Sequence, residues 1–136
     1  MTNETRFSGS SFVGGNWMNG FGVSFSPQRD GFVAQYTFKQ HQQGPKNIAH
    51  GGAVAALIDE AMTTTVYKSG YGPAYTVNLN ISYRAPIYVG ETVNIYGRLL
   101  QVEGRKLFLR AEIHLLNGTL STEADGLFIR LLDDTP

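Results

Sequence analysis

The chain has 136 residues, balances 11 Lys and Arg against 11 Asp and Glu, and contains no cysteine. The zero net charge, without any Lys or Arg run, argues against a nucleic-acid partner, and the missing cysteines exclude disulfides, thiolate metal sites and cysteine nucleophiles. No stretch approaches the roughly 20 apolar residues of a membrane span and no signal peptide is visible, so we expect a cytoplasmic protein without a membrane partner.

The chain is long enough for one domain with a buried core. Residues 1–17 are rich in Ser, Gly, Asn and Thr, which predicts a flexible N-terminal arm ahead of a single domain over 18–136. Apolar and polar residues then alternate, which indicates strands. The segments expected from this alternation are a strand over 21–25, a turn over 27–31, a strand over 32–38 and a loop over 40–49.

A helix is predicted from Gly51 to Lys68, because apolar residues nearly surround this segment and Ser69-Gly70 suits its end. Period-2 alternation returns after it, with Asn117-Gly118 as the strongest hairpin signal. The expected strands cover 76–83, 93–99, 107–115 and 120–132. One buried helix and an antiparallel sheet of five to six strands give an α+β domain, with the sheet wrapped around the helix.

Two features of the helix point to chemistry. Its start, His50-Gly51-Gly52, offers backbone N–H groups without intrahelical partners, to which a ligand oxygen can come close because glycine has no side chain. Such amides can stabilise the oxyanion of an acyl transfer. Asp59 lies two turns further on, and a buried carboxylate is costly unless it is paired or used.

These residues resemble the central-helix signature of hotdog-fold acyl-CoA thioesterases, especially the branch around phenylacetyl-CoA and hydroxybenzoyl-CoA thioesterases. Asn80-Ile-Ser-Tyr83-Arg-Ala-Pro86, Gly90-Glu91 and Gly104-Arg105 also look like this family. The resemblance implies a hotdog fold, an acyl-CoA substrate, and a homodimer or homotetramer with sites at subunit interfaces. It also implies that the Gly51 amide binds the thioester carbonyl and that Thr76 helps to hold the attacking water.

The carboxylate of Asp59 can act as general base on water or attack the thioester directly, and the sequence leaves both routes open. Thr63, four residues on, can hydrogen-bond Asp59 or a water between them. A structural alternative pairs Asp59 with a basic residue such as Arg84 or Arg110. Glu60 is expected in a structural hydrogen bond or salt bridge at the helix edge.

The remaining candidates concern substrate binding. His50 either orients the carbonyl or caps the helix, and Gly52 adds a second exposed amide. Relatives in the resembling family often carry Gln or Asn where this chain has Gly44, so Gln43 is the candidate to replace that polar group. Arg84, Arg105 and Lys106 are candidate cations for coenzyme A, with solvated surface charge as their plain alternative.

We expect no cofactor apart from coenzyme A as part of the substrate, and no metal site, because the histidines and Asp59 have no ligand spacing. The predicted reaction is hydrolysis of an acyl-CoA to a carboxylic acid and coenzyme A. Two alternatives remain: a non-catalytic acyl-CoA or lipid-binding hotdog protein, and, with less support, an enoyl-CoA hydratase or dehydratase.

Overall fold

The computed structural model describes residues 21–131, and all structural statements below concern that part of the chain. The arm predicted over 1–17 and residue 132, the end of the last expected strand, lie outside the described residues. Within them, six strands form one antiparallel sheet in the order β1-β2-β4-β5-β6-β3. The elements are β1 (Ser26–Gln28), β2 (Gly31–Thr37), the 3-10 turn η1 (Gln40–Gln42), α2 (Gly51–Lys68), β3 (Ala74–Tyr83), β4 (Thr92–Glu103), β5 (Lys106–Leu115) and β6 (Leu120–Arg130).

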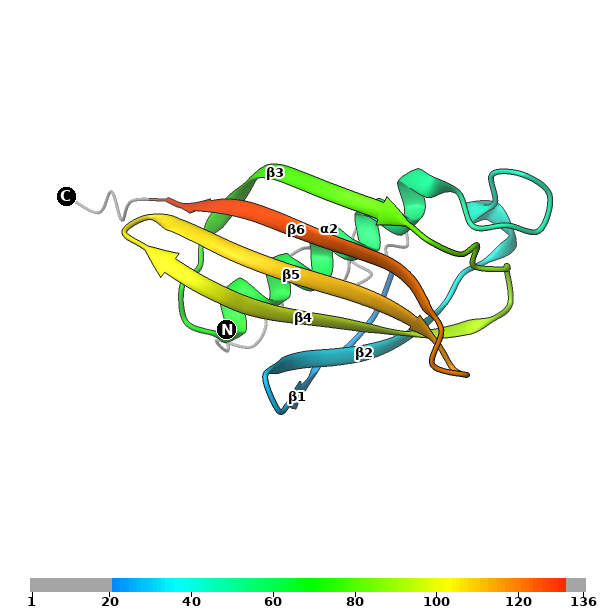
Figure 1. The fold of residues 1–136 in the computed structure, drawn as a ribbon, viewed down its shortest axis with the longest axis horizontal. Helices are drawn as coiled ribbons and strands as arrows, with labels where there is room; N and C mark the ends of the chain where they lie inside the picture. Colours follow the sequence, from blue (N-terminus) through cyan, green and yellow to red (C-terminus); the bar gives the residue numbers. More distant parts are fainter. Residues whose placement is uncertain (1–20, 132–136) are drawn as a thin grey trace.

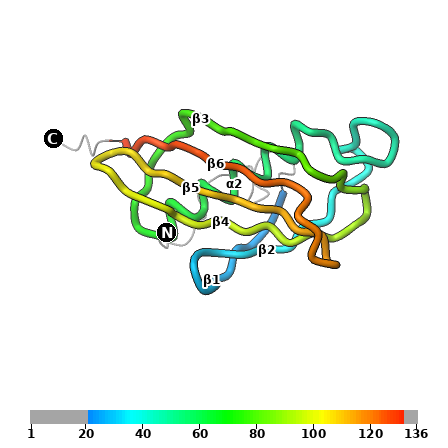
Figure 2. The backbone as a smooth tube through the Cα atoms, in the orientation of Figure 1, coloured from blue at the N-terminus to red at the C-terminus, as the bar shows by residue number. Residues whose placement is uncertain are grey.

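The sheet curls around the single long helix, with β3 at one edge and β1 at the other (Figure 1). The backbone trace shows the same arrangement, with α2 running behind the middle strands (Figure 2). The predicted α+β hotdog architecture is therefore confirmed.

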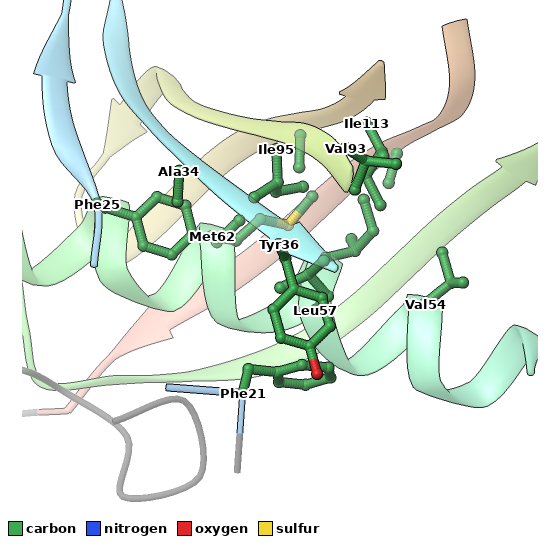
Figure 3. Close-up of a cluster of buried hydrophobic side chains, with 14 of the residues drawn as sticks. Phe21, Phe25, Ala34, Tyr36, Val54, Leu57, Met62, Val93, Ile95 and Ile113 are labelled. Carbon is green, nitrogen blue, oxygen red and sulfur yellow. The ribbon is translucent and has the colours of Figure 1, made fainter. Parts of the chain in front are cut away.

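The helix has the predicted bounds, Gly51–Lys68. On the inner face of the helix, four side chains are fully buried and pack on the strands: Leu57, Ile58, Ala61 and Met62. Figure 3 shows Leu57 and Met62 beneath Ile95 and Val93 of β4. Burial of several such side chains, each contributing about 1.5–3 kcal/mol, holds α2 against the sheet. Gly70, just beyond the helix, has a φ of 87°, as expected for a glycine that ends a helix.

Two strand glycines let the helix come close to the sheet. A Cβ at Gly97 would lie 2.5 Å from Thr65 Oγ1 and 2.9 Å from the Ala61 carbonyl oxygen, both on α2. A Cβ at Gly126 would lie 2.5 Å from Met62 Sδ. The helix backbone therefore occupies the space that a side chain on β4 would need.

Strand β3 contains a β-bulge that the sequence analysis did not predict. Its pairing with β6 shifts between Thr76 and Asn78. A regular alternation would put Thr76 on the face opposite to Leu79 and Ile81. Because the extra residue at Val77 changes the phase, Thr76 faces the helix together with Leu79 and Ile81.

The first predicted strand, over 21–25, is wrong. The strand is Ser26–Gln28, which pairs with the start of β2. Gly22 has a φ of 63°, which breaks an extended segment, and Phe21 and Phe25 on either side of it are both buried. Phe21 packs edge-on against Tyr36, with ring centroids 5.0 Å apart, so this segment covers the core without joining the sheet (Figure 3).

Replacing Gly97 by alanine should destabilise the fold, because the added methyl group meets the helix backbone at Ala61 and the hydroxyl of Thr65, which is fully buried and hydrogen-bonded to that backbone. We expect G97A to lower the free energy of unfolding by about 1–3 kcal/mol. Urea unfolding followed by circular dichroism measures this loss. Arg98→Ala, at the exposed neighbouring position, is the matched control and should change stability by about 0.5 kcal/mol or less. Equal midpoints for G97A and wild type would contradict the packing argument.

Candidate functional site

The start of α2 is held by its own N-cap residue. His50 has an extended backbone, and its Nδ1 accepts a hydrogen bond from the Gly52 amide at 2.8 Å. The His50 carbonyl oxygen accepts from the amides of Ala53 and Val54. The imidazole therefore caps the helix, and Nδ1 must be the unprotonated nitrogen, which leaves the Nε2 proton available for donation. The Gly52 amide, a predicted ligand-binding group, is already engaged.

The Gly51 amide is different, because it donates to no group within residues 21–131. It lies at the positive end of the helix dipole, where an anion is favoured. Gly51 also lines a cavity of about 290 Å³. The cavity is formed by the loop before α2, the end of β3 and the segment that follows it, and its lining includes Ile48, Val54, Tyr83, Ile87 and Thr122.

Asp59 is held from β3 by a single hydrogen bond. The Thr76 hydroxyl donates to Asp59 Oδ1 at 2.7 Å, across the bulged part of the strand. Burial raises the pKa of the Asp59 carboxyl above its ordinary value, and the hydrogen bond from Thr76 opposes that rise. Such a carboxylate accepts a proton more readily than an exposed one.

The structure does not support an ion-paired Asp59. Arg84 pairs with Glu123 at 2.8 Å. Arg110 contacts Glu112, Glu123 and Asp125 on the sheet face that carries no helix. No salt bridge to Asp59 occurs in the described residues. Its burial therefore serves no structural ion pair.

The other two candidates on the helix, Thr63 and Glu60, make no hydrogen bond to Asp59 in the structure. Thr63 is partly exposed and makes no hydrogen bond to Asp59, whose partner is Thr76. Glu60, expected at the helix edge, is instead only 9% exposed. The helix is buried on more than one side, and Glu60 lies beside the buried residues Leu57, Ala61 and Thr64.

The loop before the helix does not bring Gln43 to the site. Gln43 Oε1 accepts from the Asn47 amide at 2.9 Å, so this side chain supports the turn. Gly44 lies directly against His50, since a Cβ there would be 3.2 Å from the His50 Cα. A side chain at position 44 would therefore be in tight contact with His50, and Gln43 makes no hydrogen bond to Gly51.

The candidate cations are distributed over both ends of the sheet. Arg84 follows the end of β3 and lines the cavity at Gly51. Arg105 and Lys106 lie at the β4–β5 turn, where Lys106 pairs with Ile129, which in turn pairs with Tyr75 at the start of β3. Arg105 donates to the Arg130 carbonyl oxygen at 3.0 Å, and Lys106 is exposed. Arg84 therefore lies at the end of the sheet where Gly51 lies. Arg105 lies at the opposite end, near Thr76.

Gly51 and Asp59 are separated along the helix. Eight residues at 1.5 Å each place them about 12 Å apart along the axis. A thioester carbonyl whose oxygen meets an amide cannot also have its carbon within about 3–3.5 Å of a water held by a carboxylate that far away. One chain therefore presents two candidate half-sites, a helix start with an unengaged amide and a hydrogen-bonded carboxylate.

Sequence reasoning missed Tyr83 as a site residue. Its hydroxyl donates to the Gly51 carbonyl oxygen at 2.8 Å. A tyrosine is common in strands, so its type alone gave no signal. Tyr83 belongs to the motif Asn80–Pro86 that resembles the family, but the motif assigns it no partner, and its contact with Gly51 depends on the fold.

Among residues 21–131, no three His, Asp or Glu side chains form a group that could hold a metal ion. No helix in this part of the chain is long and apolar enough to cross a membrane.

Comparison with known proteins adds independent information. The family model described as the thioesterase superfamily matches residues 46–122. Mouse acyl-coenzyme A thioesterase THEM4 is 42% identical over 97 residues, which cover 71% of this chain and 41% of the mouse protein. Human acyl-coenzyme A thioesterase THEM5 is 29% identical over 110 residues, covering 80% and 44% of the two chains. The chain thus spans less than half the length of these curated relatives.

Solved structures share the fold. The E. coli PaaI protein from the phenylacetic acid degradation operon superposes with a TM-score of 0.74 at 18% identity, covering 81% of this chain and 84% of that one. A hypothetical thioesterase protein with coenzyme A from Streptococcus pneumoniae gives 0.73 at 18% identity, covering 79% and 84%.

Removing the hydroxyl of Thr76 should raise the pKa of Asp59 further, because the lost hydrogen bond favours the ionised carboxylate. We expect the Asp59 carboxyl in Thr76→Ala to titrate at higher pH than in wild type. A carboxyl-carbon NMR titration measures this directly. Thr76→Ser keeps the hydroxyl and is the control, which should titrate close to wild type. A downward shift in Thr76→Ala would show that Thr76 does not stabilise the carboxylate.

Proposed function

Because this chain belongs to the thioesterase superfamily, we propose that it hydrolyses acyl-CoA thioesters to a carboxylic acid and coenzyme A. The observation that carries the proposal is the pairing of two groups that thioester hydrolysis needs. One is an unengaged amide at a helix start, and the other is a partly buried carboxylate that is hydrogen-bonded to Thr76 and has no cationic partner among the described residues. The mouse and human relatives described above are named acyl-coenzyme A thioesterases, which supports the same substrate class.

The proposed chemistry uses Asp59 as general base. The Thr76 hydroxyl donates its hydrogen bond to Asp59 Oδ1, so the lone pairs of its oxygen can accept a hydrogen bond from a water molecule. Asp59 removes a proton from that water, and the oxygen forms a bond to the thioester carbon. The carbonyl oxygen becomes an oxyanion that accepts the hydrogen bond of the Gly51 amide. Collapse of this intermediate breaks the C–S bond, and coenzyme A leaves as a thiolate, which needs little acid assistance because a thiol has a pKa of about 8.5.

We propose that two copies of the chain complete each site. Gly51 and Asp59 of one chain lie about 12 Å apart along the helix. The oxygen of a thioester bound at Asp59 would therefore contact the Gly51 amide of a second copy of the chain. Strand β3 is an open sheet edge, and it exposes Tyr75, Val77 and Tyr83 to 50%, 50% and 53%. An open, apolar edge favours pairing with another strand. If β3 pairs with an antiparallel copy of itself, the Thr76 end of one copy lies beside the Tyr83 end of the other.

This arrangement also joins the candidate cations. Within one chain, Arg84 lies at the Gly51 end and Arg105 with Lys106 at the Asp59 end. An antiparallel pair places Arg84 of one copy near Arg105 and Lys106 of the other. Three cations around one composite site suit the phosphates of coenzyme A, the molecule bound in the Streptococcus pneumoniae structure of the same fold. Further pairing into a tetramer remains an expectation from the family resemblance.

Asp59→Asn should abolish most hydrolysis, because the amide cannot take a proton from water. We expect roughly a 100- to 10,000-fold loss of kcat with little change in substrate affinity. A thiol-trapping assay with phenylacetyl-, benzoyl- and straight-chain acyl-CoAs measures the rate, and titration calorimetry measures the affinity. Unchanged turnover in D59N would refute the assignment of the base. Binding by the wild-type protein without any thiol release would instead identify a non-catalytic acyl-CoA binder.

Subunit mixing tests the shared site. Gly51→Pro removes the amide alone, since proline suits the first helical position and His50 already has the extended backbone that proline requires before it. A Cβ at Gly51 meets only the Tyr83 ring and hydroxyl, at 3.7 Å or more, which is ordinary contact. We expect G51P to lose roughly 100- to 1,000-fold in kcat. Gly51→Ala, which keeps the amide, should lose far less.

Mixed dimers of G51P with D59N should then recover about one quarter of wild-type activity, since half of the dimers are mixed and each keeps one complete site. Two unfolded variants, refolded together, provide the mixture. D59N mixed with Asp59→Ala is the control and should recover nothing. No recovery in the first mixture would place the whole site within one chain.

A further inference from the structure

The peptide group that joins Gly51 and Gly52 is gripped from both sides. The Tyr83 hydroxyl donates to its carbonyl oxygen at 2.8 Å, and its N–H, that of Gly52, donates to His50 Nδ1 at 2.8 Å. The two side chains come from separate elements, the end of β3 and the loop before α2. A carbonyl oxygen has two lone pairs, so the tyrosine can use one while the helix ladder uses the other.

The preceding peptide group, between His50 and Gly51, is held on one side only. Its carbonyl oxygen accepts from the amides of Ala53 at 2.9 Å and Val54 at 3.0 Å. Its N–H is the Gly51 amide, which donates to no described group. At the helix start, the polar backbone atoms around the Gly51 α-carbon are therefore engaged by described residues except the Gly51 N–H, which belongs to a residue that lines the cavity.

This arrangement answers a problem that the sequence creates. Two successive glycines give the backbone access to many φ and ψ values, so their peptide groups can rotate unless something fixes them. A donor for an oxyanion is effective only when it already points to the place where charge develops. The helix can hold its own carbonyls, but its first amides have no partner within the helix. Contacts from outside must therefore set the direction of the first turn.

We propose that Tyr83 is a positioning residue that aims the Gly51 amide by fixing the Gly51–Gly52 peptide group together with His50. The proposal rests on the proposed function, in which this amide binds the thioester oxygen. Tyr83 acts through the backbone and needs no contact with the substrate. Its phenol must be protonated to donate, which holds at neutral pH because a tyrosine ordinarily has a pKa of about 10.

Tyr83→Phe removes the hydroxyl and keeps the ring, so it tests the contact alone. We expect kcat to fall between about 10- and 100-fold, the range that a small misplacement of a catalytic group produces, with KM nearly unchanged. Tyr75→Phe is the matched control, because Tyr75 lies on the same strand, is 50% exposed against 53% for Tyr83, and its hydroxyl bonds to no described residue. The thermal midpoint of each variant shows whether it folds.

A second measurement is independent of turnover. In Y83F, hydrogen exchange of the Gly52 amide should accelerate, and the NMR signals of the Gly51 and Gly52 amides should move, while exchange in the middle of α2 stays as in wild type. In Y75F neither signal should move. These amides can be followed whatever substrate the protein uses.

The outcomes separate the two ideas. Wild-type kcat in Y83F, or a raised KM with kcat intact, overturns the positioning role while leaving the hydrolase in place. Absence of hydrolysis by the wild-type protein overturns the proposed function, and the exchange data then still decide whether Tyr83 fixes the peptide group. Unchanged hydrogen exchange and unchanged amide signals in Y83F would show that Tyr83 does not fix the Gly51–Gly52 peptide group.

Discussion

Strand β3 touches the central helix through two hydroxyl groups, and a one-residue bulge lies between them. Thr76 reaches Asp59 and Tyr83 reaches Gly51. In a regular strand, residues seven positions apart point to opposite faces. The shift at Val77 brings both hydroxyls to the same face, so one strand contacts both half-sites. Without this change of phase, either the carboxylate or the helix start would lose its support.

The packing of α2 on the sheet fixes the positions from which these two hydrogen bonds are made. Gly97 and Gly126 admit the helix close to the sheet, and the fully buried Leu57, Ile58 and Met62 prevent it from turning about its axis. Because the helix cannot rotate, the core fixes the side of the helix on which Asp59 lies, and the hydrogen bond from Thr76 then holds its carboxylate. The polar contacts then adjust a geometry that apolar burial has already determined.

The helix and most strands could be predicted from the sequence, because their periodicity is local. The helix bounds were right, and so was the hairpin at Asn117-Gly118, where Gly118 has a φ of 94°. The bulge at Val77 has no local signature, since its sequence alternates well in either phase. The last strand shows the same limit. Phe128 is buried, whereas Leu127 and Ile129, on the other face of the strand, are only partly buried. Apolar side chains therefore occur on both faces, and their alternation alone does not tell which face meets the helix.

The site residues divide along the same line. His50, Gly51 and Asp59 belong to one short motif, and the structure places them at the start and in the middle of one helix. Tyr83 and the buried state of Glu60 depend on which strands neighbour the helix, which no window of sequence contains. The open edge of β3 has a consequence of its own. If each catalytic centre draws on two chains, the centre exists only while they are associated, and dilution alone would extinguish catalysis in molecules that are still fully folded.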